Sequence, residues 1–185
     1  TESHVMEKLA RPALRRPGNQ PFPDYPGNAR SFVHLDAGLL PYWHTLFDVC
    51  PALLKLDPPD GTRIFRAFMT WAYRRQVILD WSFHLQVCRW LLESDYRERI
   101  DAEHIETLMI ASAARWVVSD DSEALGIVLA WQGSTLPIYD WKSAATPARR
   151  PLAAELEELP PTPWDFAWCP LGTRNGAGFR RWLKV

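Results

Sequence analysis

The sequence predicts a helix-rich α+β protein, a single domain of helices with a small β-sheet or hairpin. Between Thr62 and Leu125 the chain has neither glycine nor proline, and apolar residues recur there at helical spacing. After Ser119 that periodicity gives way to short runs of β-branched and aromatic residues, which are typical of strands. With 185 residues, 47% of them hydrophobic, the chain is long enough for one hydrophobic core.

The first 30 residues are predicted to form a proline-rich basic arm, and residues 31–185 the globular domain. Proline removes a backbone donor and holds the chain extended, so the arm is not a core element. Its prolines are Pro12, Pro17, Pro21, Pro23 and Pro26. Residues 30–35 are typical of a short strand that enters the domain.

Helices are predicted over residues 41–56, 62–93 and 102–118. The middle one has a continuous apolar stripe at steps of three, four or seven residues, which indicates a core helix or two helices joined end to end. The stripe is Ile64, Phe68, Trp71, Ile78, Trp81, Leu85, Cys88 and Leu92. Asp101 can cap the free amides at the start of the third helix.

A β-hairpin is predicted from residues 127–131 and 136–141, which are short apolar runs separated by Gln-Gly-Ser-Thr. A helix over residues 122–131 is the competing interpretation, because periodicity does not separate the two for runs this short. Further along, residues 153–158 are typical of a short acidic helix.

Cysteine usage and hydropathy predict an intracellular, cytoplasmic protein with no membrane segment. The chain has three widely spaced cysteines, which do not form a disulfide framework and so favour a reducing compartment. No apolar run approaches the roughly 18 residues that cross a bilayer. The net charge is −1, but both ends of the chain are basic and the acids lie in the middle.

The most specific chemical pattern is a set of carboxylates and a lysine around the predicted hairpin. Asp120 and Glu123 precede the hairpin, and Asp140-Trp-Lys142 lies on its second strand. Metal-dependent nucleases of the restriction-enzyme type use this arrangement, in which carboxylates hold Mg²⁺ and a lysine assists. The four residues are therefore candidate catalytic residues, with Asp120 and Asp140 as metal ligands. The alternative is that Asp120 simply begins a helix.

The C-terminal tail combines arginines, glycines and tryptophans in a pattern that suits phosphate binding. Aromatic side chains stack on bases, arginines neutralise phosphates, and a glycine-rich loop can form an anion-binding nest. The candidate phosphate-binding or nucleic-acid-binding residues are Gly172, Arg174, Gly176, Arg180, Arg181 and Lys184. The alternative is a flexible glycine turn and a tail that docks through Trp182 and leaves its charges in solvent.

As a whole the chain resembles the oncogenic-suppression, or fertility-inhibition, proteins of plasmids, which block conjugation. The resemblance comes from its size, from the proline-rich segment at residues 21–30 and from the middle of the chain, which is rich in tryptophan and arginine. Those proteins belong to the ParB/sulfiredoxin fold group. The resemblance implies an α+β domain with ATP-binding and DNA-cutting activity.

Two functional hypotheses follow from the sequence. The first is a DNA-acting accessory protein that blocks conjugative transfer: a Mg²⁺-dependent nuclease, hence a DNA-binding hydrolase, with ATP as a second cofactor. The second is a protein-binding inhibitor or adaptor without catalysis. In that case exposed aromatic residues such as Trp43, Tyr73 and Trp141 would anchor the partner protein.

Overall fold

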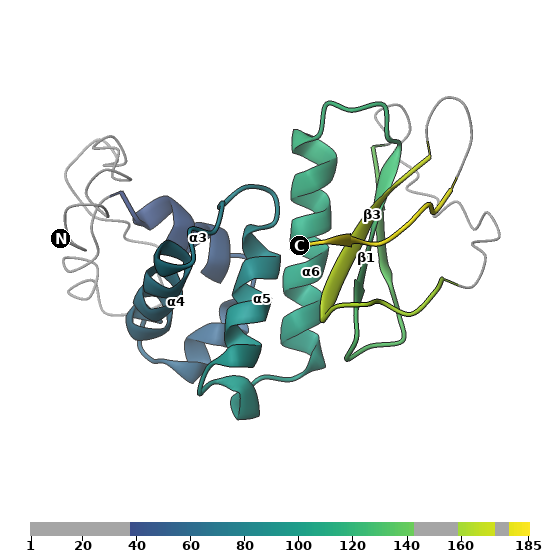
Figure 1. Cartoon of the computed structure of the whole chain (residues 1–185). Coiled ribbons are helices and arrows are strands. Elements are labelled where there is room, and N and C mark those ends of the chain that lie inside the picture. Colours follow the sequence, from purple (N-terminus) through teal and green to yellow (C-terminus); the bar gives the residue numbers. More distant parts are fainter. Residues whose placement is uncertain (1–37, 143–158, 173–177) are drawn as a thin grey trace. The chain divides into compact units, whose positions relative to one another are not determined.

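The computed structural model describes residues 38–142, 159–172 and 178–185 (Figure 1). The predicted arm, the strand at residues 30–35 and the helix at residues 153–158 lie outside these residues. The helix-rich α+β class is confirmed, since helices precede a small antiparallel sheet. The chain divides into two compact units, one ending at Arg74 and the other beginning at Arg75.

The first unit contains the helices α3 (Leu40–Phe47) and α4 (Thr62–Arg74) and, between them, the 3₁₀-helix η1 (Pro51–Leu56). The prediction of one helix over residues 41–56 is wrong in its second half. Pro51 has no N–H to continue the α-helical ladder, so the chain tightens into a 3₁₀ turn instead. Trp43 is 0% exposed, and its indole N–H donates to the backbone oxygen of Asp60 over 2.8 Å. It is therefore a core residue, and the prediction that Trp43 is a partner anchor is wrong.

Two buried aspartates hold the start of α4. Oδ2 of Asp57 accepts hydrogen bonds from the backbone N–H groups of Arg63 and Ile64, at 2.7 and 3.0 Å. Oδ1 of Asp60 accepts from the backbone N–H of Thr62 over 3.0 Å. These carboxylates satisfy amides that have no partner within the helix.

The second unit begins inside the stretch for which the sequence predicts one helix or two helices joined end to end, residues 62–93. One continuous helix is wrong and two helices are correct, but they are not joined directly, because α4 ends at Arg74 and α5 (Phe83–Glu93) begins after a turn. Gln76 has a positive φ of 53°, and Oδ1 of Asp80 accepts from the backbone N–H of Ser82 over 2.8 Å, an arrangement typical of turns. Ile78 is accordingly 75% exposed rather than part of the apolar stripe.

Helix α6 (Ala102–Ser119) confirms the third predicted helix to within a residue, and the short 3₁₀-helix η2 (Arg97–Arg99) precedes it. Oδ1 of Asp101 accepts from the backbone N–H of His104 over 3.1 Å, so the predicted cap is confirmed. In the middle of α6, the buried hydroxyl of Ser112 accepts from the backbone N–H of Leu85 over 3.1 Å. That amide lies in the first turn of α5, so one helix caps the other.

The sheet has four antiparallel strands in the order β2-β1-β3-β4. The strands are β1 (Gly126–Trp131), β2 (Ile138–Trp141), β3 (Phe166–Leu171) and β4 (Leu183–Lys184). The predicted hairpin is confirmed as β1 and β2, and the competing helix over residues 122–131 is excluded. Gly126 allows their close approach, because a Cβ there would lie 2.7 Å from the backbone oxygen of Asp140.

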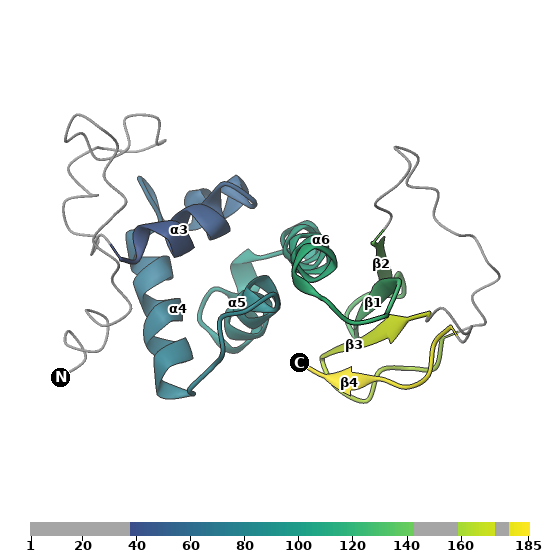
Figure 2. The ribbon, with the colours of Figure 1, turned by 90° about the horizontal axis from the view of Figure 1, so that it is seen from above.

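Within the second unit, α5, α6 and the sheet form successive layers (Figure 2). Ile127 and Leu129 are buried and alternate with Val128, so they point toward α6 while Val128 points to the opposite face. We call that opposite side the outer face. Its core consists of Val128, Ala167, Cys169, Leu171 and Trp182. Among the described residues, no helix is long and apolar enough to cross a membrane.

Candidate functional site

The structure brings together two of the four predicted nuclease residues, Asp120 and Lys142. The Lys142 ammonium forms an ion pair with Oδ2 of Asp120 and donates to the backbone oxygen of Ser122 over 2.8 Å. It also lies 5.0 Å from the centre of the Trp116 ring. These contacts join the end of α6 to the end of β2.

The other two predicted residues, Glu123 and Asp140, differ in their exposure to solvent. Glu123 is exposed. Asp140 is buried, and its Oδ1 accepts from the backbone N–H of Trp141 over 2.8 Å. In the described part of the chain, no three His, Cys, Asp or Glu side chains are grouped so that they could hold a metal ion. The Mg²⁺ and ATP cofactors, the catalytic roles of these residues and the metal-ligand roles of Asp120 and Asp140 stay untested predictions.

The electrostatics of Asp120 follow from these contacts. Burial raises the pKa of the Asp120 carboxyl. Hydrogen bonds from Lys142 and Ser122, together with the lysine charge, lower this pKa by more than burial raises it, so the net pKa lies below the ordinary value. A carboxyl whose pKa falls on folding stabilises the fold above its unfolded pKa of about 3.9. That contribution disappears as the pH drops through the folded pKa.

Asp120→Asn is expected to lower the free energy of unfolding at pH 7 by about 1 kcal/mol, since it removes the charge that pairs with Lys142. The difference from wild type should shrink as the pH falls below about 4 and through the lowered pKa of the folded carboxyl, because the wild-type side chain then becomes neutral as well. Urea unfolding at pH 7 and pH 3 measures both values. Asp121→Asn is the matched control, because Asp121 is exposed and belongs to no ion pair that the structure describes. Equal effects of the two substitutions at pH 7 would contradict the assignment.

The basic tail docks through its tryptophan. Trp182 is 9% exposed, and its indole N–H donates to the backbone oxygen of Pro160 over 2.8 Å, whereas Arg180, Arg181 and Lys184 are exposed. Gly172, the residue after β3, has a φ of +63°. Arg174 and Gly176 lie outside the described residues. The alternative interpretation of the tail therefore describes Trp182 correctly, and phosphate binding by this set stays a prediction.

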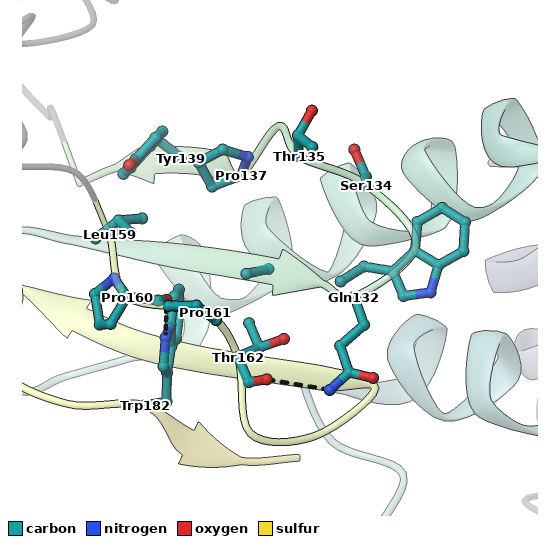
Figure 3. A pocket seen from close by; sticks show the side chains of 12 residues that line it. Gln132, Ser134, Thr135, Pro137, Tyr139, Leu159, Pro160, Pro161, Thr162 and Trp182 are labelled. Carbon is teal, nitrogen blue, oxygen red and sulfur yellow. Dashed lines mark hydrogen bonds between the residues drawn. The ribbon is translucent and has the colours of Figure 1, made fainter.

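A pocket of about 690 Å³ lies beside the outer face of the sheet (Figure 3). The described residues that line it carry no charged side chain. They are Ala130, Trp131, Gln132, Ser134, Thr135, Pro137, Tyr139, Leu159, Pro160, Pro161, Thr162 and Trp182. Such a lining suits a neutral ligand with apolar surface and hydrogen-bonding groups.

Two side-chain donors hold the proline segment that forms one wall of this pocket. Nε2 of Gln132 donates to the backbone oxygen of Thr162 over 3.1 Å, and Trp182 holds Pro160 two residues earlier (Figure 3). Tyr139 lies on the opposite wall. Burial raises the pKa of its hydroxyl, which therefore stays protonated at neutral pH and can donate a hydrogen bond.

Strand β2 forms an edge of the described sheet next to the pocket. The backbone N–H of Lys142 donates to the backbone oxygen of Leu125, on the side of β1. Because successive residues of a strand turn their backbone groups to opposite sides, those of Tyr139 and Trp141 point away from β1. The backbone N–H of Trp141 donates to Oδ1 of Asp140. The backbone N–H and C=O of Tyr139 thus face the edge of the described sheet.

Residues 22–185 match a protein family described as "Methanobactin biosynthesis cassette protein MbnC-like". The chain belongs to this MbnC-like family. No curated protein matches the chain.

Membership of the MbnC-like family corrects the identity and function predicted from the sequence. The resemblance to fertility-inhibition proteins and to the ParB/sulfiredoxin group is wrong, and so is the function of a DNA-binding nuclease that blocks plasmid conjugation. The resemblance rested on proline and tryptophan content, which reflects packing and extended segments in many families. Asp120 and Lys142 had the spacing of a nuclease site, but an ion pair between a helix end and a strand end needs the same spacing.

Sequence reasoning missed the pocket of this MbnC-like protein. The run Leu-Pro-Pro-Thr-Pro at residues 159–163 was the available signal, because such a run is extended and exposes carbonyl oxygens to donors. The donors themselves, Gln132 and Trp182, come from distant parts of the chain, and no local pattern connects them.

Proposed function

We propose that the chain takes part in methanobactin biosynthesis by holding an extended segment of a polypeptide encoded by the same cassette. The family match over residues 22–185 supports the pathway. The uncharged, aromatic- and proline-lined pocket is the observation that supports the ligand class.

The chemistry of the pocket fits a peptide in two ways. Tyr139 and Trp182 offer flat apolar surfaces, and the neighbouring prolines add rigid ones, so apolar side chains can be buried there. Gln132, Thr135 and Thr162 add neutral hydrogen-bonding groups that suit peptide N–H and C=O groups. Aromatic-lined grooves recognise extended, proline-containing peptides in this manner.

The edge of β2 supports an extended rather than a helical ligand. The backbone N–H and C=O of Tyr139 point to the edge of the described sheet, where a strand can pair with them. In this mode the backbone hydrogen bonds provide affinity, and the pocket beside the edge selects alternate side chains.

The test is to titrate the purified protein with each of the other polypeptides of its cassette and to follow tryptophan fluorescence and heat. Saturable binding of one of them is expected. Thr135→Arg places a charge and a long side chain in the uncharged pocket and should weaken that binding at least about tenfold. Ala102→Arg is the matched control, because Ala102 is exposed on α6 and does not line the pocket.

Either of two results would refute the proposal. One is that no polypeptide of the cassette binds at concentrations up to about 1 mM, the weak end of specific recognition. The other is that Thr135→Arg binds as tightly as Ala102→Arg, since the ligand would then occupy a different surface.

A further inference from the structure

We propose that one residue of the bound polypeptide segment pairs with both backbone groups of Tyr139, and that Pro137 and Asp140 confine the backbone pairing to this point of the β2 edge. This inference rests on the proposed function, because it concerns the same bound segment. It adds a backbone requirement to the uncharged pocket, since the paired residue of the segment must have an N–H and so is not proline.

The backbone donors along β2 are unevenly available. Residues 137, 139 and 141 turn their backbone groups to the edge of the described sheet, whereas residues 138 and 140 face β1. Pro137 has no N–H, and the N–H of Trp141 donates to Oδ1 of Asp140 over 2.8 Å. Within residues 137–141, only Tyr139 therefore presents to this edge an N–H that no described residue accepts.

Pro137 and Asp140 have the character of residues that protect an edge strand. Proline and inward-pointing charged side chains are common means of keeping such a strand from pairing with other chains. Asp140 is buried and lies opposite Ile127, so its carboxylate is on the face of the sheet toward α6. The two residues protect the edge on either side of Tyr139 and leave a gap there. One residue of an antiparallel strand fits this gap, because it exchanges two hydrogen bonds with the residue opposite.

The gap at Tyr139 lies on the pocket side of the sheet. Tyr139 lies opposite Val128, packs against the outer-face core and lines the pocket (Figure 3). Residues directly opposite each other in an antiparallel pair direct their side chains to the same face. The paired residue of the segment therefore directs its side chain to the outer face, beside the Tyr139 ring. A slip of one residue turns a different set of side chains to that face, so the pocket and the gap select the same residue of the segment.

Amide hydrogen exchange, followed by NMR, measures this pairing directly. The probes are synthetic 12-residue peptides that tile the polypeptides of the cassette, and the peptide that binds most tightly is used. On binding, exchange of the Tyr139 amide should slow at least about tenfold, whereas that of Trp141 should stay unchanged. The amides of Ile138 and Asp140 face β1 with and without peptide and are the internal references.

N-methylation of the peptide, one residue at a time, identifies the paired residue. Methylation replaces the N–H that donates to the backbone oxygen of Tyr139, so at this residue it should weaken binding at least about tenfold and remove the protection of the Tyr139 amide. A scan in which no methylated peptide has both effects would overturn the inference.

Asp140→Ala tests the confinement of the pairing. The substitution frees the N–H of Trp141, and Asp140 does not line the pocket. The bound peptide should then protect the amides of both Tyr139 and Trp141 and bind about threefold more tightly. Asp140→Asn keeps a side-chain oxygen at this position and should behave as wild type. A purely structural role of Asp140 would change stability without moving protection to a second amide. Circular dichroism shows whether each variant is folded, and the wild-type exchange pattern decides the pairing if Asp140→Ala is not.

The outcomes separate this inference from the proposed function. If the Tyr139 amide is already protected without peptide, or gains no protection while Thr135→Arg still weakens binding, the pairing inference is overturned and the proposed function stands. Protection of the Trp141 amide on binding to wild type would overturn the role of Asp140. If no tiled peptide and no intact polypeptide binds, the inference and the proposed function are both overturned.

Discussion

Trp182→Ala is expected to lower the free energy of unfolding of the second unit by about 3–5 kcal/mol, the usual cost of deleting a large buried aromatic side chain. The indole packs with Val128, Cys169 and the other outer-face core residues. It also donates the hydrogen bond that holds Pro160. The substitution therefore removes core packing and one wall of the pocket, and peptide binding should be lost as well. Urea unfolding and the titration described above measure the two effects.

Trp182→Phe separates packing from hydrogen bonding. Phenylalanine keeps an aromatic ring against Phe179, whose ring centre lies 4.8 Å from that of Trp182, but has no N–H for Pro160. We expect a smaller loss of stability, together with weaker binding because the proline wall is no longer held. Trp164→Ala is the control for stability, since Trp164 is 37% exposed. A cost below about 1 kcal/mol for Trp182→Ala would show that the outer face does not depend on this residue.

Trp43→Ala is expected to destabilise the first unit by a comparable amount, about 3–5 kcal/mol. The side chain is 0% exposed, packs against Phe47 at 4.8 Å between ring centres, and donates to Asp60 in the turn before α4. Its removal leaves a cavity and deprives the Asp60 carbonyl of its indole donor. Loss of α-helical signal at a lower urea concentration is the measurement.

The matched control for Trp43 is Tyr73, which is 41% exposed on α4. Tyr73→Ala should change stability by less than about 1 kcal/mol, because much of its ring is already in water. If the two substitutions cost the same, Trp43 is not the centre of the first unit's core.

Elements with a local signal were predictable from the sequence. Helix α6 combines an aspartate cap with a long apolar stripe, and both appear where the sequence indicates them. The hairpin was equally readable, because β-branched runs flank a short polar turn. The break before α5 was not predictable, since the apolar spacing continues through Ile78. Only the structure shows that this side chain is exposed and therefore does not belong to a buried helix face. Strand β3 was missed because Pro170 and the surrounding aromatics do not alternate with polar residues.

The candidate site shows the limit of motif reasoning more sharply. The sequence correctly placed Asp120 and Lys142 on either side of the hairpin, and the structure joins them. It could not distinguish a catalytic pair from an ion pair that fastens two elements, because both need opposite charges at that spacing. The pocket depends on Gln132, Pro160 and Trp182, which only the tertiary fold brings together.

The hydroxyl of Ser112 that caps α5 has a consequence for local unfolding. The Leu85 amide donates to a side chain on α6 rather than to its own helix, so it can exchange its hydrogen with solvent whenever the two helices separate, even while α5 remains wound. Its exchange rate should follow the opening of the α5–α6 pair and not the fraying of α5. In Ser112→Ala, that single amide is expected to lose its protection first, which makes it a reporter of how firmly the two helices are held together.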